Sequence, residues 1–289
     1  MDLNLEGMRD RTAAGQWSVD EFDWSEPIEG AEGLGPRQLK DAGQMLLFVS
    51  GLERRAARIF DLCAHYAPDE TTREIYRLFY EDEIRHSEAE TRLAARLGVE
   101  WKDLPRPTRM AFKSMDRLAD WEHRNPFVYD MASSSILLFE LALDGILIPV
   151  LKERIKDPLQ NEIFRRIDVD ESRHLAMDYW VLDRKGDPET DWRRELPREA
   201  REQMRNPSVI RMYAHLGELL LTLLASFGAM AFTVPTVRKL ARDPRHLDGY
   251  LARVRRIPHK APNATNVETF KMSMKGLERI LKVGDLVFA

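Results

Sequence analysis

The chain has 289 residues, of which 44% are hydrophobic and 32% are charged, as is ordinary for a globular protein with a substantial core. The formal net charge of −4 gives no electrostatic attraction to DNA or RNA, so we expect no nucleic-acid partner. The single cysteine, Cys63, excludes a disulfide scaffold, and the sequence does not open on a basic region followed by an apolar signal core. These features predict a cytoplasmic protein with no stable membrane insertion.

The first predicted elements are an arm and a long helix. Residues 1–36 are acidic and weakly periodic, and we expect Trp17 and Trp24 to hold this arm against the rest of the protein. Over residues 37–65, apolar side chains recur at intervals of three and four, which is typical of a helix with one buried face. Glu53 lies in the middle of that apolar face, where an unpaired charge is unfavourable.

A second helix is predicted over residues 69–97, and a crossover follows over residues 98–125. Pro105 and Pro107 are expected to break the chain in this crossover, and residues 110–121 can form a helix within it. A long connection between two helical hairpins is typical of one class of four-helix bundle.

Two further helices are predicted over residues 126–156 and 158–183. The first carries Glu140 and Asp144 as the two charged side chains of its apolar centre. The pair Asp157-Pro158 indicates the start of the second, because aspartate favours the N-cap and proline the first helical position.

The C-terminal part, residues 184–289, is predicted to form a helical extension packed on the bundle. Its most apolar stretch, residues 216–232, is short for a membrane span and is interrupted by polar residues. This composition favours a buried or interface helix over membrane contact or a substrate channel. The predicted fold is therefore all-α, with an arm (1–36), a four-helix bundle with a long crossover (37–183) and the extension.

One pentapeptide pattern, Asp-Glu-x-Arg-His, occurs twice, at residues 82–86 and 170–174. Each copy follows a lone glutamate in an apolar helix, and the interval between the two glutamates is 30 residues in the first unit and 31 in the second. The midpoints of the intervals, Pro68 and the bond between Arg154 and Ile155, coincide with predicted turns. Each lone glutamate should therefore lie level with the motif glutamate of its antiparallel neighbour.

The repeated pattern has the composition of a dinuclear metal site. A glutamate and a histidine three residues apart on a helix project from one face, so each motif offers an oxygen and a nitrogen to one region. Four converging buried carboxylates would repel one another, and bound cations remove that repulsion. This ligand set in a four-helix bundle is typical of a carboxylate-bridged iron or manganese centre. The predicted ligands are Glu53, Glu83, His86, Glu140, Glu171 and His174.

Two more residue types recur in the motif. Asp82 and Asp170 precede the motif glutamates, and each is predicted to accept a hydrogen bond, because a metal-bound histidine usually donates its second N–H to a carboxylate or a carbonyl. Arg85 and Arg173 recur as well, and the sequence leaves open whether they neutralise the acidic centre or face solvent.

These residues resemble the ferritin-like di-iron carboxylate superfamily, which includes ribonucleotide reductase small subunits, acyl carrier protein desaturases, multicomponent monooxygenase hydroxylases and aromatic amine N-oxygenases. The resemblance covers about half of the chain, residues 37–183. It implies that each motif aspartate hydrogen-bonds to the histidine of the other motif, Asp82 to His174 and Asp170 to His86. The implied iron ligands are Glu53, Glu83 and His86 for one ion and Glu140, Glu171 and His174 for the other, with Glu83 and Glu171 as bridges.

Two positions depart from particular members of the superfamily. Radical-generating reductase subunits carry a tyrosine one turn after the first motif histidine, where this chain has Glu90, which argues against a similar tyrosyl radical. Amine N-oxygenases carry an extra histidine where this chain has Ile167, which argues against a seventh ligand. Because the chain has one cysteine, it cannot carry a four-cysteine iron site, and reducing electrons are expected from a separate donor protein.

The sequence therefore predicts an O2-activating non-haem di-iron oxidoreductase, a monooxygenase or desaturase that acts on a small, largely apolar organic substrate. The expected cofactors are two iron ions per chain, with O2 as co-substrate, and a mixed manganese–iron centre and a homodimeric assembly stay open. The alternatives are a ferroxidase or iron-storage protein and a non-catalytic metal-binding bundle. The predicted substrate pocket, about one turn from the ligands, comprises Phe79, Tyr80, Ser133, Ile136, Leu137, Asp144 and Ile167.

Overall fold

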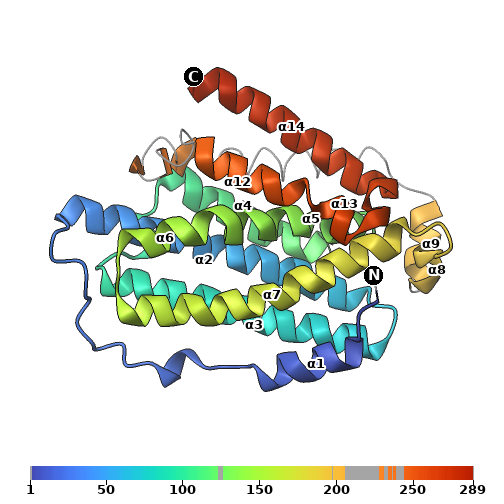
Figure 1. Ribbon diagram of the computed structural model, residues 1–289, viewed down its shortest axis with the longest axis horizontal. Helices are drawn as coiled ribbons and strands as arrows, with labels where there is room; N and C mark the ends of the chain where they lie inside the picture. Colours follow the sequence, from blue (N-terminus) through green and yellow to red (C-terminus); the bar gives the residue numbers. More distant parts are fainter. Residues whose placement is uncertain are drawn as a thin grey trace.

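The chain is all-α in a computed structural model, as the sequence predicted. No strand occurs among the residues that the structure describes, which are 2–122, 126–196, 198–205, 228–230, 234–235, 237–238 and 244–288. Four long helical stretches make up its centre (Figure 1). They are α2 (Pro36–His65), α3 (Glu70–Arg96), the run of α5 (Pro126–Ala142), η3 (Leu143–Leu147) and α6 (Ile148–Arg154), and α7 (Pro158–Gly186).

The four stretches form two antiparallel hairpins with short turns. Between α2 and α3, Asp69 caps the new helix, and its Oδ1 accepts from the backbone N–H of Thr72 at 2.8 Å. Between α6 and α7, Asp157 caps α7 with Pro158 at the first position, and its Oδ2 accepts from the N–H of Gln160 at 3.1 Å. Both turns fall at the interval midpoints, as predicted.

The helix predicted over residues 126–156 is not regular throughout. The five residues of η3 form a π-helical turn between α5 and α6. Pro149 has no N–H to offer to the carbonyl of Gly145, which lies within this wider turn. By length and composition alone the run Pro126–Glu153 could cross a membrane, yet 65% of its most apolar stretch is buried inside the protein.

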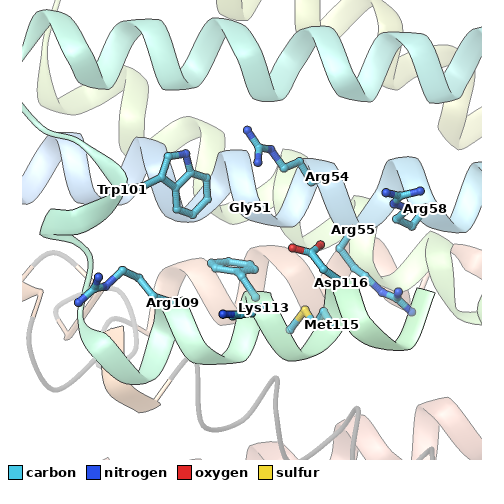
Figure 2. Close-up of a pocket in the computed structure, with 10 residues that line it drawn as sticks. Gly51, Arg54, Arg55, Arg58, Trp101, Arg109, Lys113, Met115 and Asp116 are labelled. Atoms are coloured by element: carbon cyan, nitrogen blue, oxygen red, sulfur yellow. The ribbon is translucent and has the colours of Figure 1, made fainter. Parts of the chain in front are cut away.

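The crossover contains more helix than predicted. The expected helix over 110–121 is present as part of α4 (Arg106–Glu122), which lies beside α2 (Figure 2) and follows the short turn η2 (Trp101–Asp103). Pro107 does not break the chain, because it occupies the first turn of α4, where a missing N–H removes no intrahelical bond.

The arm also contains a helix that the sequence prediction missed. In α1 (Leu5–Ala14), the Asn4 side chain caps the start by accepting from the N–H of Gly7 at 2.9 Å. Only Met8 and Thr12 of this helix are buried, so its apolar periodicity is faint. The helix lies against α3 and is followed by the turn η1 (Val19–Glu21).

The C-terminal part adds helices that pack on α5 and α7 (Figure 1). Tyr250 and Val254 share an apolar cluster with Leu138 and Leu141 of α5. Most of the apolar segment 216–232 lies outside the described residues. The elements of this part are α8 (Trp192–Glu195), α9 (Arg198–Arg205), α12 (Pro244–Val254), α13 (Ile257–Lys260), η4 (Pro262–Asn266) and α14 (Glu268–Phe288).

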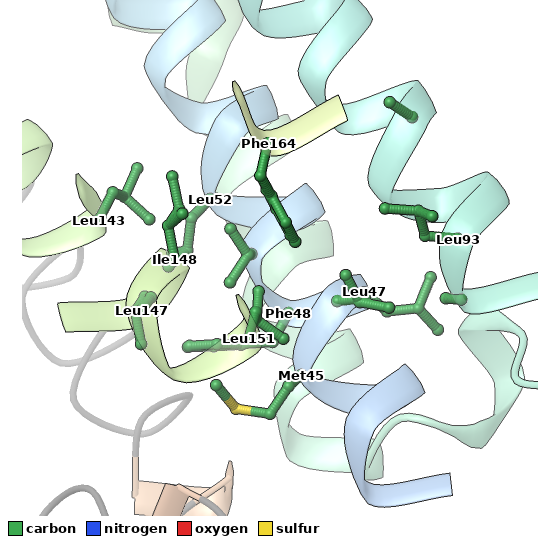
Figure 3. Close-up of a cluster of buried hydrophobic side chains, with 14 of the residues drawn as sticks. Met45, Leu47, Phe48, Leu52, Leu93, Leu143, Leu147, Ile148, Leu151 and Phe164 are labelled. Atoms are coloured by element: carbon green, nitrogen blue, oxygen red, sulfur yellow. The ribbon is translucent and has the colours of Figure 1, made fainter. Parts of the chain in front are cut away.

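Apolar side chains from α2, α3, η3, α6 and α7 fill one end of the four-helix centre (Figure 3). Phe48, Leu52 and Phe164 are among the largest side chains there, and each is at most 1% exposed. Burying one such side chain contributes about 1.5–3 kcal/mol relative to leaving it in water. A second cluster around Phe60 and Phe79 fills the other end, so the middle of the bundle lies between two tightly packed layers.

We predict that Gly43→Ala destabilises the fold. A Cβ at Gly43 would lie 2.5 Å from Cγ2 and 2.6 Å from Cβ of the buried, β-branched Val99, which cannot turn away. Overpacking of this kind costs about 1–3 kcal/mol in the free energy of unfolding, measurable by urea titration. Gly249→Ala on α12 is the control, since nothing lies within 4 Å of its added Cβ. Equal unfolding midpoints for the two variants would contradict the prediction.

Candidate metal centre

The fold brings the six predicted ligands together in the middle of the bundle. The α2 and α5 helices each contribute one glutamate, and α3 and α7 each contribute a glutamate and a histidine. All six side chains are at most 1% exposed. Their ligand atoms form two groups, each within 4.8 Å, that share two glutamates. The groups are Glu53, Glu83, His86 and Glu171, and Glu83, Glu140, Glu171 and His174.

The ligand atoms of this cluster face one another: His174 Nδ1 lies 3.0 Å from Glu83 Oε1, and His86 Nδ1 lies 3.3 Å from Glu171 Oε1. Both carboxylate oxygens of all four glutamates, and Nδ1 of both histidines, are buried without a hydrogen bond. A buried polar atom left unpaired costs about 1–3 kcal/mol, and a charged one costs more. Two divalent cations would match the four negative charges and use these atoms as ligands. The residues therefore fit a pair of metal ions.

The electrostatics of the cluster reflect this crowding. Burial raises the pKa of Glu83 and of Glu140 well above the usual range, and the neighbouring Glu53 and Glu171 raise them further. Although burial opposes its ionisation, the imidazoles of His174 and His86 hold the pKa of Glu171 well below its usual value. Without cations, the cluster must therefore keep protons on part of its carboxylates.

The histidines are oriented by the aspartates of the opposite motif. Nε2 of His86 lies 3.0 Å from Asp170 Oδ2, and Nε2 of His174 lies 3.3 Å from Asp82 Oδ2. Because a carboxylate only accepts, each Nε2 is the donor, and each Nδ1 faces the glutamates. This crossed pairing is the one that the family resemblance implied. The hydrogen bonds and nearby Glu171 raise the pKa of His174 to about 9, against the opposing effect of burial.

Arg85 and Arg173 neutralise the two aspartates, which answers the question that the sequence left open. Each arginine forms an ion pair with the aspartate three residues before it, Asp82 or Asp170. Each guanidinium also lies within 4 Å of the other aspartate, at 3.8 Å for Arg85 and 3.9 Å for Arg173. The negative charge of the aspartates is thus balanced separately from that of the glutamates.

Residues of the N-terminal arm contact the two aspartates that orient the histidines. The buried Trp17 donates from Nε1 to Asp170 Oδ2 at 2.9 Å, and its ring lies under the guanidinium of Arg85, 5.0 Å from it. Gln16 donates to Asp82 Oδ1 at 2.7 Å and accepts from Arg85 Nη1 at 2.7 Å. Trp17 therefore holds the arm in place, as predicted, and its contacts reach the residues that orient the histidines.

Two further acidic residues lie beside the cluster, and sequence analysis gave neither of them a role at the centre. Glu90 and Asp178 each lie four residues after a motif histidine, at equivalent positions of the two units. Both are buried, and neither oxygen of Glu90 nor Oδ2 of Asp178 has a hydrogen-bond partner. Burial raises the pKa of Glu90 well above its usual value and that of Asp178 to about 8. Extending the alignment of the two motifs by one helical turn would have found them.

The predicted substrate-pocket residues lie in packed regions around the centre. The ring of Phe79 is 4.3 Å from that of His174, and Ser133 accepts from Lys185 at 2.7 Å. Tyr80 and Ile136 belong to the same apolar cluster as Phe79, Leu137 to the C-terminal cluster and Ile167 to the first core cluster. The side chain of Asp144 lies outside the described residues. Their role in binding a substrate stays a prediction.

No protein-family model matches the chain, and no curated protein is similar to it at a significant level. The assignment of function therefore depends on the residues of the centre.

We predict that Asp82→Ala and Asp170→Ala weaken metal retention by about 10- to 100-fold, because each removes the acceptor that orients one histidine. Chelator competition on the iron-loaded variants measures the effect. Asp168→Ala is the matched control, because Asp168 lies on the outside of α7, the helix that carries Asp170. Its carboxylate pairs with Lys152 of α6. Wild-type retention in both test variants would show that the aspartates do not support the ligands.

Asp178 should make the metal-free protein less stable as the pH rises. Its folded pKa is about 8 against an ordinary value of 3.8, so between these values the unfolded chain loses a proton that the folded chain keeps. Relative to Asp178→Asn, the wild type should lose at most about 1.4 kcal/mol of unfolding free energy per pH unit in this interval. Urea unfolding of both proteins from pH 4.5 to 8 measures it. Parallel pH profiles would contradict the assignment.

Proposed function

We propose that this chain belongs to the ferritin-like di-iron carboxylate superfamily and is an O2-activating non-haem di-iron oxidoreductase. The observation that supports this proposal most is the pair of ligand groups that share Glu83 and Glu171 in the middle of a helical bundle. Two carboxylates shared by both ligand groups would hold two metal ions next to each other, which is what a two-electron reaction with O2 requires.

The chemistry of the donor set favours iron or manganese. Carboxylate oxygens and imidazole nitrogens suit these ions, and the chain's one cysteine, Cys63, is not among the ligand groups. When bound at these residues, two ferrous ions would supply the electrons for the reduction of O2. Burial raises the pKa of the Cys63 thiol, which keeps it protonated, and a separate donor protein is the proposed source of reducing electrons.

The residues around the centre would protect the reaction from water. The rings of Phe60 and Phe79 lie 5.0 and 4.3 Å from the ring of His174, and Ile167 is fully buried on α7. These apolar contacts keep bulk solvent from the ligands and favour a largely apolar substrate. Hydroxylation or desaturation of such a substrate, near Ser133, Ile136 and Leu137, is the proposed reaction.

Iron loading and O2 uptake test the proposal. Anaerobically prepared wild type should bind two ferrous ions per chain, and His86→Ala and His174→Ala should each lose at least one, because each removes one nitrogen ligand. His259→Ala, an exposed histidine of α13, is the control and should bind two. Full occupancy in both test variants would contradict the ligand assignment.

The reaction class has its own test. With a chemical reductant and a panel of apolar substrates, O2 consumption should be coupled to an oxidised organic product, and the protein should be a small oligomer. A hollow multi-subunit shell that fills with ferric mineral would replace this reading by iron storage. Iron binding without O2 consumption would replace it by a non-catalytic metal-binding bundle.

A further inference from the structure

A second candidate site lies between α2 and α4, outside the carboxylate cluster. A cavity of about 340 Å³ opens there (Figure 2). This volume lies within the range of small-molecule pockets. None of the six predicted metal ligands lines it, so this cavity is separate from the candidate metal centre.

The floor of the cavity is aromatic and apolar. Phe112 and Met115 are 9% and 3% exposed, and the rings of Trp101 and Phe112 meet edge to face with centroids 5.9 Å apart. Gly51 leaves room for this floor, because a Cβ at that position would lie 2.4 Å from Phe112 Cζ. A flat or aliphatic group could lie on this surface.

The walls and rim of the cavity are strongly basic. Arg54, Arg55 and Arg58 come from α2, and Arg109 and Lys113 come from α4. Asp116 is the single acidic residue that lines the cavity, although the whole chain has a net charge of −4. Figure 2 shows Arg55, Lys113 and Asp116 between the two helices, with Arg54 and Arg58 along α2 and Arg109 near the start of α4.

The spacing of these charges is unfavourable by itself. Arg54 and Arg58 are four residues apart on one helix, and Arg109 and Lys113 are four apart on the other. Like charges at this spacing destabilise a helix. Within the described part of the chain, no ion pair joins any of these four side chains to a carboxylate. An anion in the cavity would supply the missing counter-charge.

One arginine at the rim of the cavity is already held in place. Arg54 donates from Nε to Ser87 Oγ at 3.0 Å, and its guanidinium carbon lies 5.3 Å from the ring centroid of Trp101. These contacts fix the plane of the guanidinium. A guanidinium that is held in place loses less conformational entropy when it binds a carboxylate or a phosphate.

We propose that this cavity binds a small organic oxyanion, a carboxylate or a phosphate ester with an apolar body. The body lies on Phe112 and Met115, and the basic side chains around it provide the counter-charge for the head. The proposal does not depend on the bound metal or on the proposed oxidation chemistry.

Calorimetric titration of the full chain tests the site with four probes: octanoate, octyl phosphate, inorganic phosphate and octanol. At least one amphiphilic anion should bind more tightly than both inorganic phosphate and octanol, because inorganic phosphate lacks the apolar body and octanol lacks the charged head. The tighter of octanoate and octyl phosphate identifies the head group.

The rim is tested with Arg58→Gln combined with Arg109→Gln. Both residues are exposed, so the fold should persist, which the urea midpoint checks. Losing charged hydrogen-bond donors should weaken binding of the amphiphilic anion at least about tenfold. Arg165→Gln combined with Arg194→Gln removes the same charge from exposed positions elsewhere and should change the affinity less than about twofold.

Three results would overturn the proposal. The first is that neither octanoate nor octyl phosphate binds. The second is that inorganic phosphate or octanol binds as tightly as octanoate and octyl phosphate do. The third is that the rim variant and the control variant bind the amphiphilic anion with the same affinity.

Discussion

The cost of burying four carboxylates in the middle of a helical bundle governs the rest of this structure. Each ionised carboxylate taken from water into the interior costs several kcal/mol unless opposite charge compensates it. Glu53, Glu83, Glu140 and Glu171 meet in one place, and their oxygens have no hydrogen-bond partners in the described protein. Bound cations or protons make such a cluster compatible with a stable fold, and apolar layers pack on both sides of it.

The surroundings of the cluster serve the same constraint. The pairing of Asp82 with Arg85 and of Asp170 with Arg173 provides acceptors for the histidines without adding net charge to the centre. Trp17 then covers this arrangement from the arm, so a segment far away in the sequence contributes to the orientation of a ligand. The two helical hairpins are thus joined by hydrogen bonds across the centre as well as by apolar packing.

The helical hairpins and the convergence of the six predicted ligand residues could be predicted because their signals are local and repeated. The intervals from Glu53 to Glu83 and from Glu140 to Glu171 place both turns, and the turns lie there. The helix α1 and the π-helical turn η3 could not be predicted in this way. The first buries too few apolar residues to show a period, and the second depends on how Pro149 is accommodated within an otherwise regular helix. The basic cavity was missed because its residues come from helices that only the tertiary fold brings together.

X-ray absorption spectroscopy of the iron-loaded chain can test whether Glu83 and Glu171 bridge two metal ions, as we propose. We expect oxygen and nitrogen ligands, no sulfur ligand, and an iron–iron scattering contribution at about 3.5–4 Å, the spacing of two-metal sites. A spectrum with isolated iron ions and no metal–metal contribution would contradict it.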